Sequence, residues 1–145
     1  MSDNAIKEDA YDLLENIPSN MVQFIASNNQ IYGILPDSLN NLQKLRQFNM
    51  SSNSLSGALP GFTESFATLQ KLDLSNQDQT SGFTGSIPED TWRSLSLKVL
   101  NLAGNKLTGS IATLVGTMTV LEEFDVSNNR LNSSLPTELG MLDGK

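Results

Sequence analysis

The chain has 145 residues, of which 38% are hydrophobic, and this length and composition suit one folded domain. Nine basic against sixteen acidic residues give a net charge of −7, which repels phosphate backbones and excludes nucleic acid as an expected partner. The sequence contains no cysteine and no histidine, which excludes disulfides, thiolate zinc sites and imidazole bases. We therefore expect no cofactor, no metal and no enzymatic activity.

The first twenty residues predict an N-terminal amphipathic helical cap. Apolar side chains recur at helical spacing at Ile6, Ala10, Leu13, Leu14 and Ile17. The candidate N-caps are Ser2, Asp3 and Asn4, and Pro18 ends the helix. Only Lys7 is basic among four acidic residues, so a cap over the next unit is favoured over a helix that binds a membrane surface. No export signal and no stretch of roughly 18 apolar residues is found, so we expect no direct membrane insertion.

Residues 21–145 contain five units in one frame, which predict a solenoid. The units begin at Met21, Leu45, Leu69, Leu97 and Leu121. Three steps are 24 residues long, and the step from Leu69 to Leu97 is 28. Counting from these starts, the fourth and sixth places are apolar in every unit: Phe24, Phe48, Leu72, Leu100 and Phe124, then Ala26, Met50, Leu74, Leu102 and Val126. Places two apart in a strand share a face, so these side chains predict a common core beneath a parallel sheet.

The ninth place predicts a ladder of asparagines that satisfies buried backbone groups where the chain turns after each strand. Its members are Asn29, Asn53, Asn105 and Asn129. The third unit has Gln77 at this place, where its four extra residues enter. We therefore expect a local bulge around Asp78 to Ser81.

The second half of each unit predicts short helical turns on the convex side. Glycine at the thirteenth place and proline at the sixteenth redirect the chain in most units. Apolar residues at helical spacing follow at Leu39, Leu42, Phe66, Met118, Leu139 and Leu142. Trp92 lies in this region, and packing of its ring against a neighbouring turn is favoured over an exposed interface anchor.

The pattern L-x-x-L-x-L-x-x-N-x-L-x-G-x-I/L-P over residues 21–145 resembles the plant-type leucine-rich repeat of receptor-like kinase ectodomains and of similar algal proteins. The resemblance implies an α/β-repeat solenoid with a parallel β-sheet on the concave side and short helical turns and loops on the convex side. It also implies an extracellular or membrane-attached parent protein, although the paired cysteines of plant ectodomains are absent here. Since a sixth unit would begin after Lys145, we expect further repeats or a capping partner at that end.

The outward places three, five and seven of the strands predict the binding surface. These concave-face residues are polar and include no aromatic side chain: Gln47, Asn49, Ser51, Lys71, Asp73, Ser75, Asn101, Glu123, Asp125 and Ser127. They favour a hydrogen-bonding platform for a protein, a peptide or a glycan. Two alternatives remain: a solvated face without a partner, and catalysis or cation binding by Asp73 and Asp125. These aspartates are two strand spacings apart, roughly 9.6 Å. That separation is at or beyond the limit of about 9.5 Å for paired catalytic carboxylates.

These observations predict macromolecular recognition, as part of a receptor-like protein. The alternative is a structural or surface-binding solenoid that contacts ice or polysaccharide. Ice binding favours a regular row of threonines, whereas the twelfth place is Tyr32, Ser56, Thr84, Thr108 and Asn132. The irregular row favours recognition of a protein.

Overall fold

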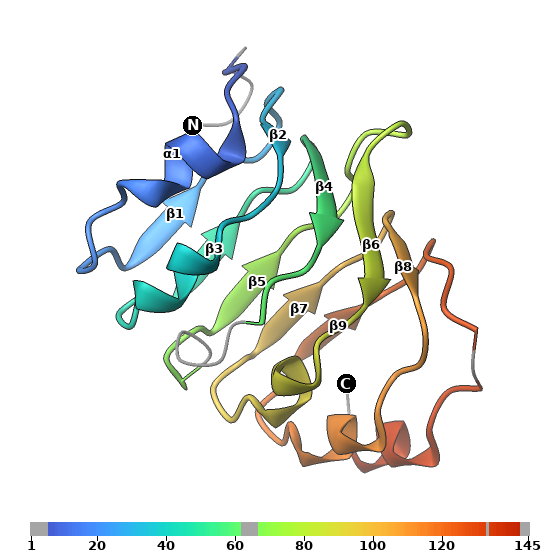
Figure 1. Cartoon of the computed structure of the whole chain (residues 1–145). Coiled ribbons are helices and arrows are strands. Elements are labelled where there is room, and N and C mark those ends of the chain that lie inside the picture. The colour runs from blue at the N-terminus through green and yellow to red at the C-terminus, as the bar shows by residue number, and fades with distance from the viewer. Residues whose placement is uncertain (1–5, 62–66, 133, 143–145) are drawn as a thin grey trace.

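The computed structural model describes residues 6–61, 67–132 and 134–142. Two parallel sheets run along the length of the solenoid, with short helical turns between successive strands (Figure 1). The candidate N-caps Ser2, Asp3 and Asn4 and the apolar residue Phe66 lie outside the described residues.

The concave side is a five-stranded parallel sheet in the order β1-β3-β5-β7-β9. Its strands are β1 (Gln23–Ile25), β3 (Gln47–Asn49), β5 (Lys71–Asp73), β7 (Val99–Asn101) and β9 (Glu123–Asp125). The register pairs equal places of neighbouring units, so Phe48 lies beside Leu72 and Leu72 beside Leu100. The predicted repeat frame and parallel sheet are confirmed.

The fourth and sixth places form the core, as predicted. Phe48, Leu72, Leu100 and Leu74 are almost completely buried. At the open end of the solenoid Phe124 is only half-buried, because no further unit lies against it in the described chain. Each unit thus buries its apolar side chains against its neighbours, which is how repeat proteins gain their stability.

A second parallel sheet lies beside the first and was not predicted. Its strands are β2 (Tyr32–Gly33), β4 (Ser54–Ala58), β6 (Gly82–Ser86) and β8 (Lys106–Thr108), in the order β2-β4-β6-β8. The expected loops are therefore partly strands. Glycine is rare in strands, and Gly57 and Gly85 lie inside β4 and β6 with φ of 82° and 77°, which hid the strand pattern.

The predicted convex turns are 3₁₀ helices in four units. They are η1 (Asp37–Asn41), η3 (Glu89–Arg93), η4 (Thr113–Thr117) and η5 (Thr137–Met141). An extended proline or alanine precedes each of them, and its carbonyl accepts the first bond, as in Leu39 N–H to Pro36 O at 3.2 Å. Trp92 lies in η3 and is 1% exposed, so the packed interpretation of this residue is correct.

The N-terminal helix α1 (Ala10–Glu15) is shorter than the sequence predicts. Its N-cap is Asp9, whose side chain accepts the Tyr11 N–H, and Ile6 precedes the helix instead of belonging to it. The reason is that residues 6–9 run alongside β2, where the Ile6 and Glu8 carbonyls accept backbone N–H groups of the first unit. This segment occupies the first edge of the second sheet.

The asparagines of the ninth place join each turn to the one before it. Asn53 Oδ1 accepts the Ile31 N–H at 3.0 Å, and its Nδ2 donates to the carbonyls of Ala26 and Met50 at 2.9 and 3.1 Å. Gln77 takes the same part in the third unit, since its Oε1 accepts the Leu55 N–H at 3.0 Å. The longer side chain keeps the ladder continuous where the four extra residues enter.

Candidate binding surfaces

Seven of the ten predicted concave-face residues lie in the strands of the first sheet, at the places that alternate with the apolar fourth place. The register sets Asn49 beside Asp73, Asp73 beside Asn101, and Asn101 beside Asp125. A serine of the seventh place lies two residues after every strand of this sheet except β7, which is followed by Ala103. Exposure differs along the surface: Lys71, Glu123 and Asp125 are exposed, whereas Ser75 is buried.

The fifth-place side chains have a structural task that the sequence did not predict. Asp73 Oδ1 accepts the N–H and the hydroxyl of Ser75 at 3.1 and 2.7 Å. The same bond to the N–H two residues later is made in three other units: Asn49 to Ser51, Asn101 to Ala103 and Asp125 to Ser127. Aspartate and asparagine side chains often accept the backbone N–H two residues later and so form a local turn. One oxygen of each of these four side chains is therefore occupied, and the third place is freer to contact a ligand.

The turn bond should lower the pKa of Asp125. Hydrogen bonds from the Ser127 hydroxyl and backbone N–H favour the carboxylate and hold its pKa below the ordinary 3.8. A lowered folded pKa stabilises the protein fully above the unfolded pKa, and this stabilisation is lost as pH falls through the folded pKa. An NMR titration of the side-chain carboxyl is expected to give a midpoint below 3.8.

Asp125→Asn is the matched control for this titration. Its amide oxygen can accept the Ser127 N–H, as Asn101 does for Ala103, but it does not titrate. The variant should lose less stability than the wild type on acidification. An Asp125 midpoint at or above 3.8 would contradict the turn bond.

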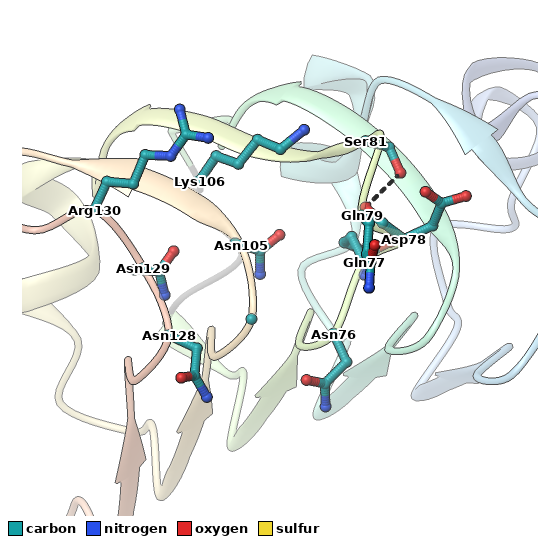
Figure 2. Close-up of a pocket in the computed structure, with 11 residues that line it drawn as sticks. Asn76, Gln77, Asp78, Gln79, Ser81, Asn105, Lys106, Asn128, Asn129 and Arg130 are labelled. Carbon is teal, nitrogen blue, oxygen red and sulfur yellow. Dashed lines mark hydrogen bonds between the residues drawn. The ribbon is translucent and has the colours of Figure 1, made fainter.

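A hollow of about 550 Å³ lies where the chain leaves the concave strands of the third to fifth units (Figure 2). Its lining comes from the eighth to tenth places and the inserted turn: Asn76, Gln77, Asp78, Gln79, Ser81, Gly104, Asn105, Lys106, Asn128, Asn129 and Arg130. Of these, the sequence analysis singled out Gln77, Asn105 and Asn129 at the ladder place and the segment from Asp78 to Ser81 as a bulge, but none of them as a binding residue. The four-residue insertion was the one signal that pointed here.

The inserted residues form a turn at one side of this hollow. The Ser81 N–H donates to the Asp78 carbonyl at 3.0 Å, and the Asp78 carboxylate accepts the N–H and the hydroxyl of Thr80, each at 2.7 Å. Lys106 Nζ donates to the Thr80 carbonyl at 2.9 Å. The bulge expected at Asp78 to Ser81 is thus an ordered turn that is tied to the next unit.

Neither a metal cluster nor a membrane span is found in the described ranges. No group of three or more aspartates and glutamates there lies close enough to hold a metal ion, and Asp73 and Asp125 belong to separate strands. No helix there has the length and hydropathy that crossing a bilayer requires.

Known proteins share both the repeat and the fold. The Leucine Rich Repeat family pattern matches residues 44–66, 96–118 and 120–142. The plant peptide hormone receptor RGFR1, solved in complex with RGF2, is 32% identical with a TM-score of 0.88 over 98% of this chain. The Arabidopsis receptor kinase HAESA ectodomain, in complex with an IDA peptide hormone, is 30% identical with a TM-score of 0.86 over 97%. A chain of the BIR3–SERK2 complex from Arabidopsis thaliana is 29% identical, with a TM-score of 0.77 over 86% of this chain.

The chain is therefore a leucine-rich-repeat protein. Its repeats are of the plant type, the type of these receptor ectodomains. It covers 22% of the RGFR1 chain, 23% of the HAESA chain and 65% of the matched chain in the BIR3–SERK2 complex. A search of the curated proteins finds no significant match.

Proposed function

We propose that this chain is a non-catalytic, receptor-like recognition module that binds a protein or peptide on its concave face. The observation that carries the proposal is the aligned, uncovered row of polar outward residues on the first sheet. The likeness to receptors solved with the peptide ligands RGF2 and IDA supports a peptide as the partner. A hydrogen-bonding surface also suits a glycan, and the selection experiment distinguishes a glycan from a peptide.

The two ends of the solenoid differ, which bears on the parent protein. We propose that residues 1–20 cap the first unit and that residues 21–145 are the solenoid proper. Leu135 is 68% exposed, and a hollow of about 200 Å³ beside β9 is lined mainly by Leu121, Phe124 and Leu139. Further repeats or a capping partner would bury this apolar layer, in an extracellular or membrane-attached parent like the receptor kinases.

Selection from a random peptide library tests the function directly. Peptides enriched on the wild-type chain are expected to bind Lys71→Glu and Glu123→Lys at least about tenfold more weakly, because a charge reversal repels the selected partner. Both side chains are exposed and make no turn bond, so their exchange leaves the fold intact. Asp73→Ala is less suitable because it also removes the Ser75 turn bond.

Lys44→Glu is the matched control, since Lys44 is an exposed lysine outside the concave face. It should bind the selected peptides as the wild type does. Equal binding by all variants would overturn the concave site. Failure to enrich any peptide, together with capture of oligosaccharides on a glycan array, would replace the peptide by a glycan.

A further inference from the structure

One of the residues that line the hollow beside the inserted turn is a glycine, Gly104. Asn76, Gly104 and Asn128 hold the eighth place in successive units and share left-handed backbone, with φ of 54°, 65° and 53°. A Cβ at Gly104 would lie 2.6 Å from Asn76 Oδ1, so any side chain there would have to displace the Asn76 amide. Figure 2 shows Asn76 and Asn128 on the side of the hollow opposite Lys106 and Arg130.

Two cationic side chains lie along one edge of the hollow. Lys106 and Arg130 hold the tenth place of neighbouring units, and Figure 2 shows both extending over the same edge. The ammonium of Lys106 is fixed to the inserted turn through the Thr80 carbonyl at 2.9 Å. The guanidinium of Arg130 has neither a hydrogen bond nor an ion pair with the rest of the described chain. Its fork of donors is therefore available to a ligand.

The charges around the hollow sum to one positive charge, in a chain whose net charge is −7. Lys106 and Arg130 contribute two positive charges and Asp78 one negative charge. The Asp78 carboxylate stays ionised, since the Thr80 N–H and hydroxyl, in that order, lower its pKa. The hollow therefore attracts an anionic ligand, and the planar guanidinium of Arg130 matches the two oxygens of a carboxylate.

We propose that this hollow binds a carboxylate group of a peptide. A guanidinium can donate two parallel bonds to a carboxylate, and the amides of Asn76 and Asn128 offer donors and acceptors to the neighbouring peptide groups. The hollow shares no residue with the concave-face set, so the two sites can be tested separately. The inserted turn then has a function: it forms one wall and positions the ammonium of Lys106.

The test is an NMR titration with acetyl-Ala-Glu-Ala-amide, following the arginine Nε–H and asparagine side-chain amide signals. Addition of the peptide is expected to shift the signals of Arg130 and Asn128. Acetyl-Ala-Gln-Ala-amide, which lacks the carboxylate, should bind at least about tenfold more weakly, since bonds to a charged group are the stronger ones. Acetyl-Ala-Ala-Ala with a free carboxyl end shows whether a chain terminus is preferred to a side chain.

Three variants test the assignment of the hollow. Arg130→Gln should weaken binding about tenfold or more, because the guanidinium bonds are lost. Gly104→Asn should weaken binding, because the new side chain displaces the Asn76 amide that lines the hollow. Asparagine is also the residue type that the neighbouring units carry at a similar backbone angle. Lys44→Gln, outside both the hollow and the concave face, removes the same charge elsewhere and should leave binding unchanged.

Several outcomes would overturn this assignment. They are equal binding of the glutamate and glutamine peptides, tighter binding of inorganic phosphate or sulfate, and loss of binding in Lys44→Gln but not in Arg130→Gln. The peptides selected on the concave face should bind Arg130→Gln normally, so a failure of one site is distinguishable from a failure of the other. Should Gly104→Asn fail to fold, Arg130→Gln alone decides the question.

Discussion

Asn53→Ala is expected to lower the free energy of unfolding by about 3 kcal/mol, the upper end of the cost of about 1–3 kcal/mol for a buried polar group left without a partner. Asn53 is 3% exposed, and water cannot replace it. The variant leaves the Ile31 N–H without its acceptor, whereas the Ala26 carbonyl keeps the Asn29 Nδ2 donor at 3.2 Å. The Ile31 N–H lies inside the turn, where the backbone has no ladder partner. Urea unfolding followed by circular dichroism measures the loss.

Asn129→Ala is the matched control for Asn53→Ala. Asn129 makes the same bonds, to the Leu107 N–H and the Leu102 carbonyl at 3.0 and 2.9 Å, but it lies half-buried in the last unit. Water can replace its side chain there, so the expected loss is about 1 kcal/mol. Equal losses at the two sites would show that burial of the ladder is not what stabilises the solenoid.

Trp92→Ala is expected to cost about 3–5 kcal/mol, the usual result of deleting a large aromatic side chain from a core. The indole is 1% exposed and meets the ring of Phe124 edge to face, with centroids 6.2 Å apart. It therefore connects the convex turn η3 to the last concave strand. As the single tryptophan of the chain, it also reports its surroundings by fluorescence, and its emission should be blue-shifted until unfolding.

Leu95→Ala is the control for the loss at Trp92. Leu95 lies three residues further along and is 74% exposed, so its truncation should change stability by no more than about 0.5 kcal/mol. Red-shifted emission from the folded wild type, or a loss at Trp92 as small as that at Leu95, would contradict the packing of the indole against Phe124.

The repeat frame was predictable because one spacing recurs five times. Each unit places its apolar residues two apart, and no other frame would bury Leu72, Leu74, Leu100 and Leu102 together. The second sheet was not predictable from this spacing, because its strands contain glycine at left-handed φ. The start of α1 was misplaced for a different reason: the pairing of residues 6–9 with β2 is a tertiary contact that helical periodicity does not contain.

The candidate site was also predictable from the sequence only in part. The concave-face residues follow from strand alternation, so their common surface was predictable. The turn bonds of Asp73 and Asp125 were signalled by the residue type, since aspartate and asparagine often accept the backbone N–H two residues later. The hollow was not predictable, because its lining residues come from three neighbouring units and from the inserted turn. The repeat pattern of a single unit does not contain the path of that turn or the placement of the three units.

Thiol labelling of a single introduced cysteine tests the central claim most directly, because the native chain contains none. A peptide selected on the wild type, at saturating concentration, is expected to slow labelling of Lys71→Cys on the concave face by about tenfold or more. Labelling of Lys44→Cys, outside that face, should be unchanged. Protection of Lys44→Cys, or none at Lys71→Cys while the peptide is bound, would contradict recognition by the concave sheet.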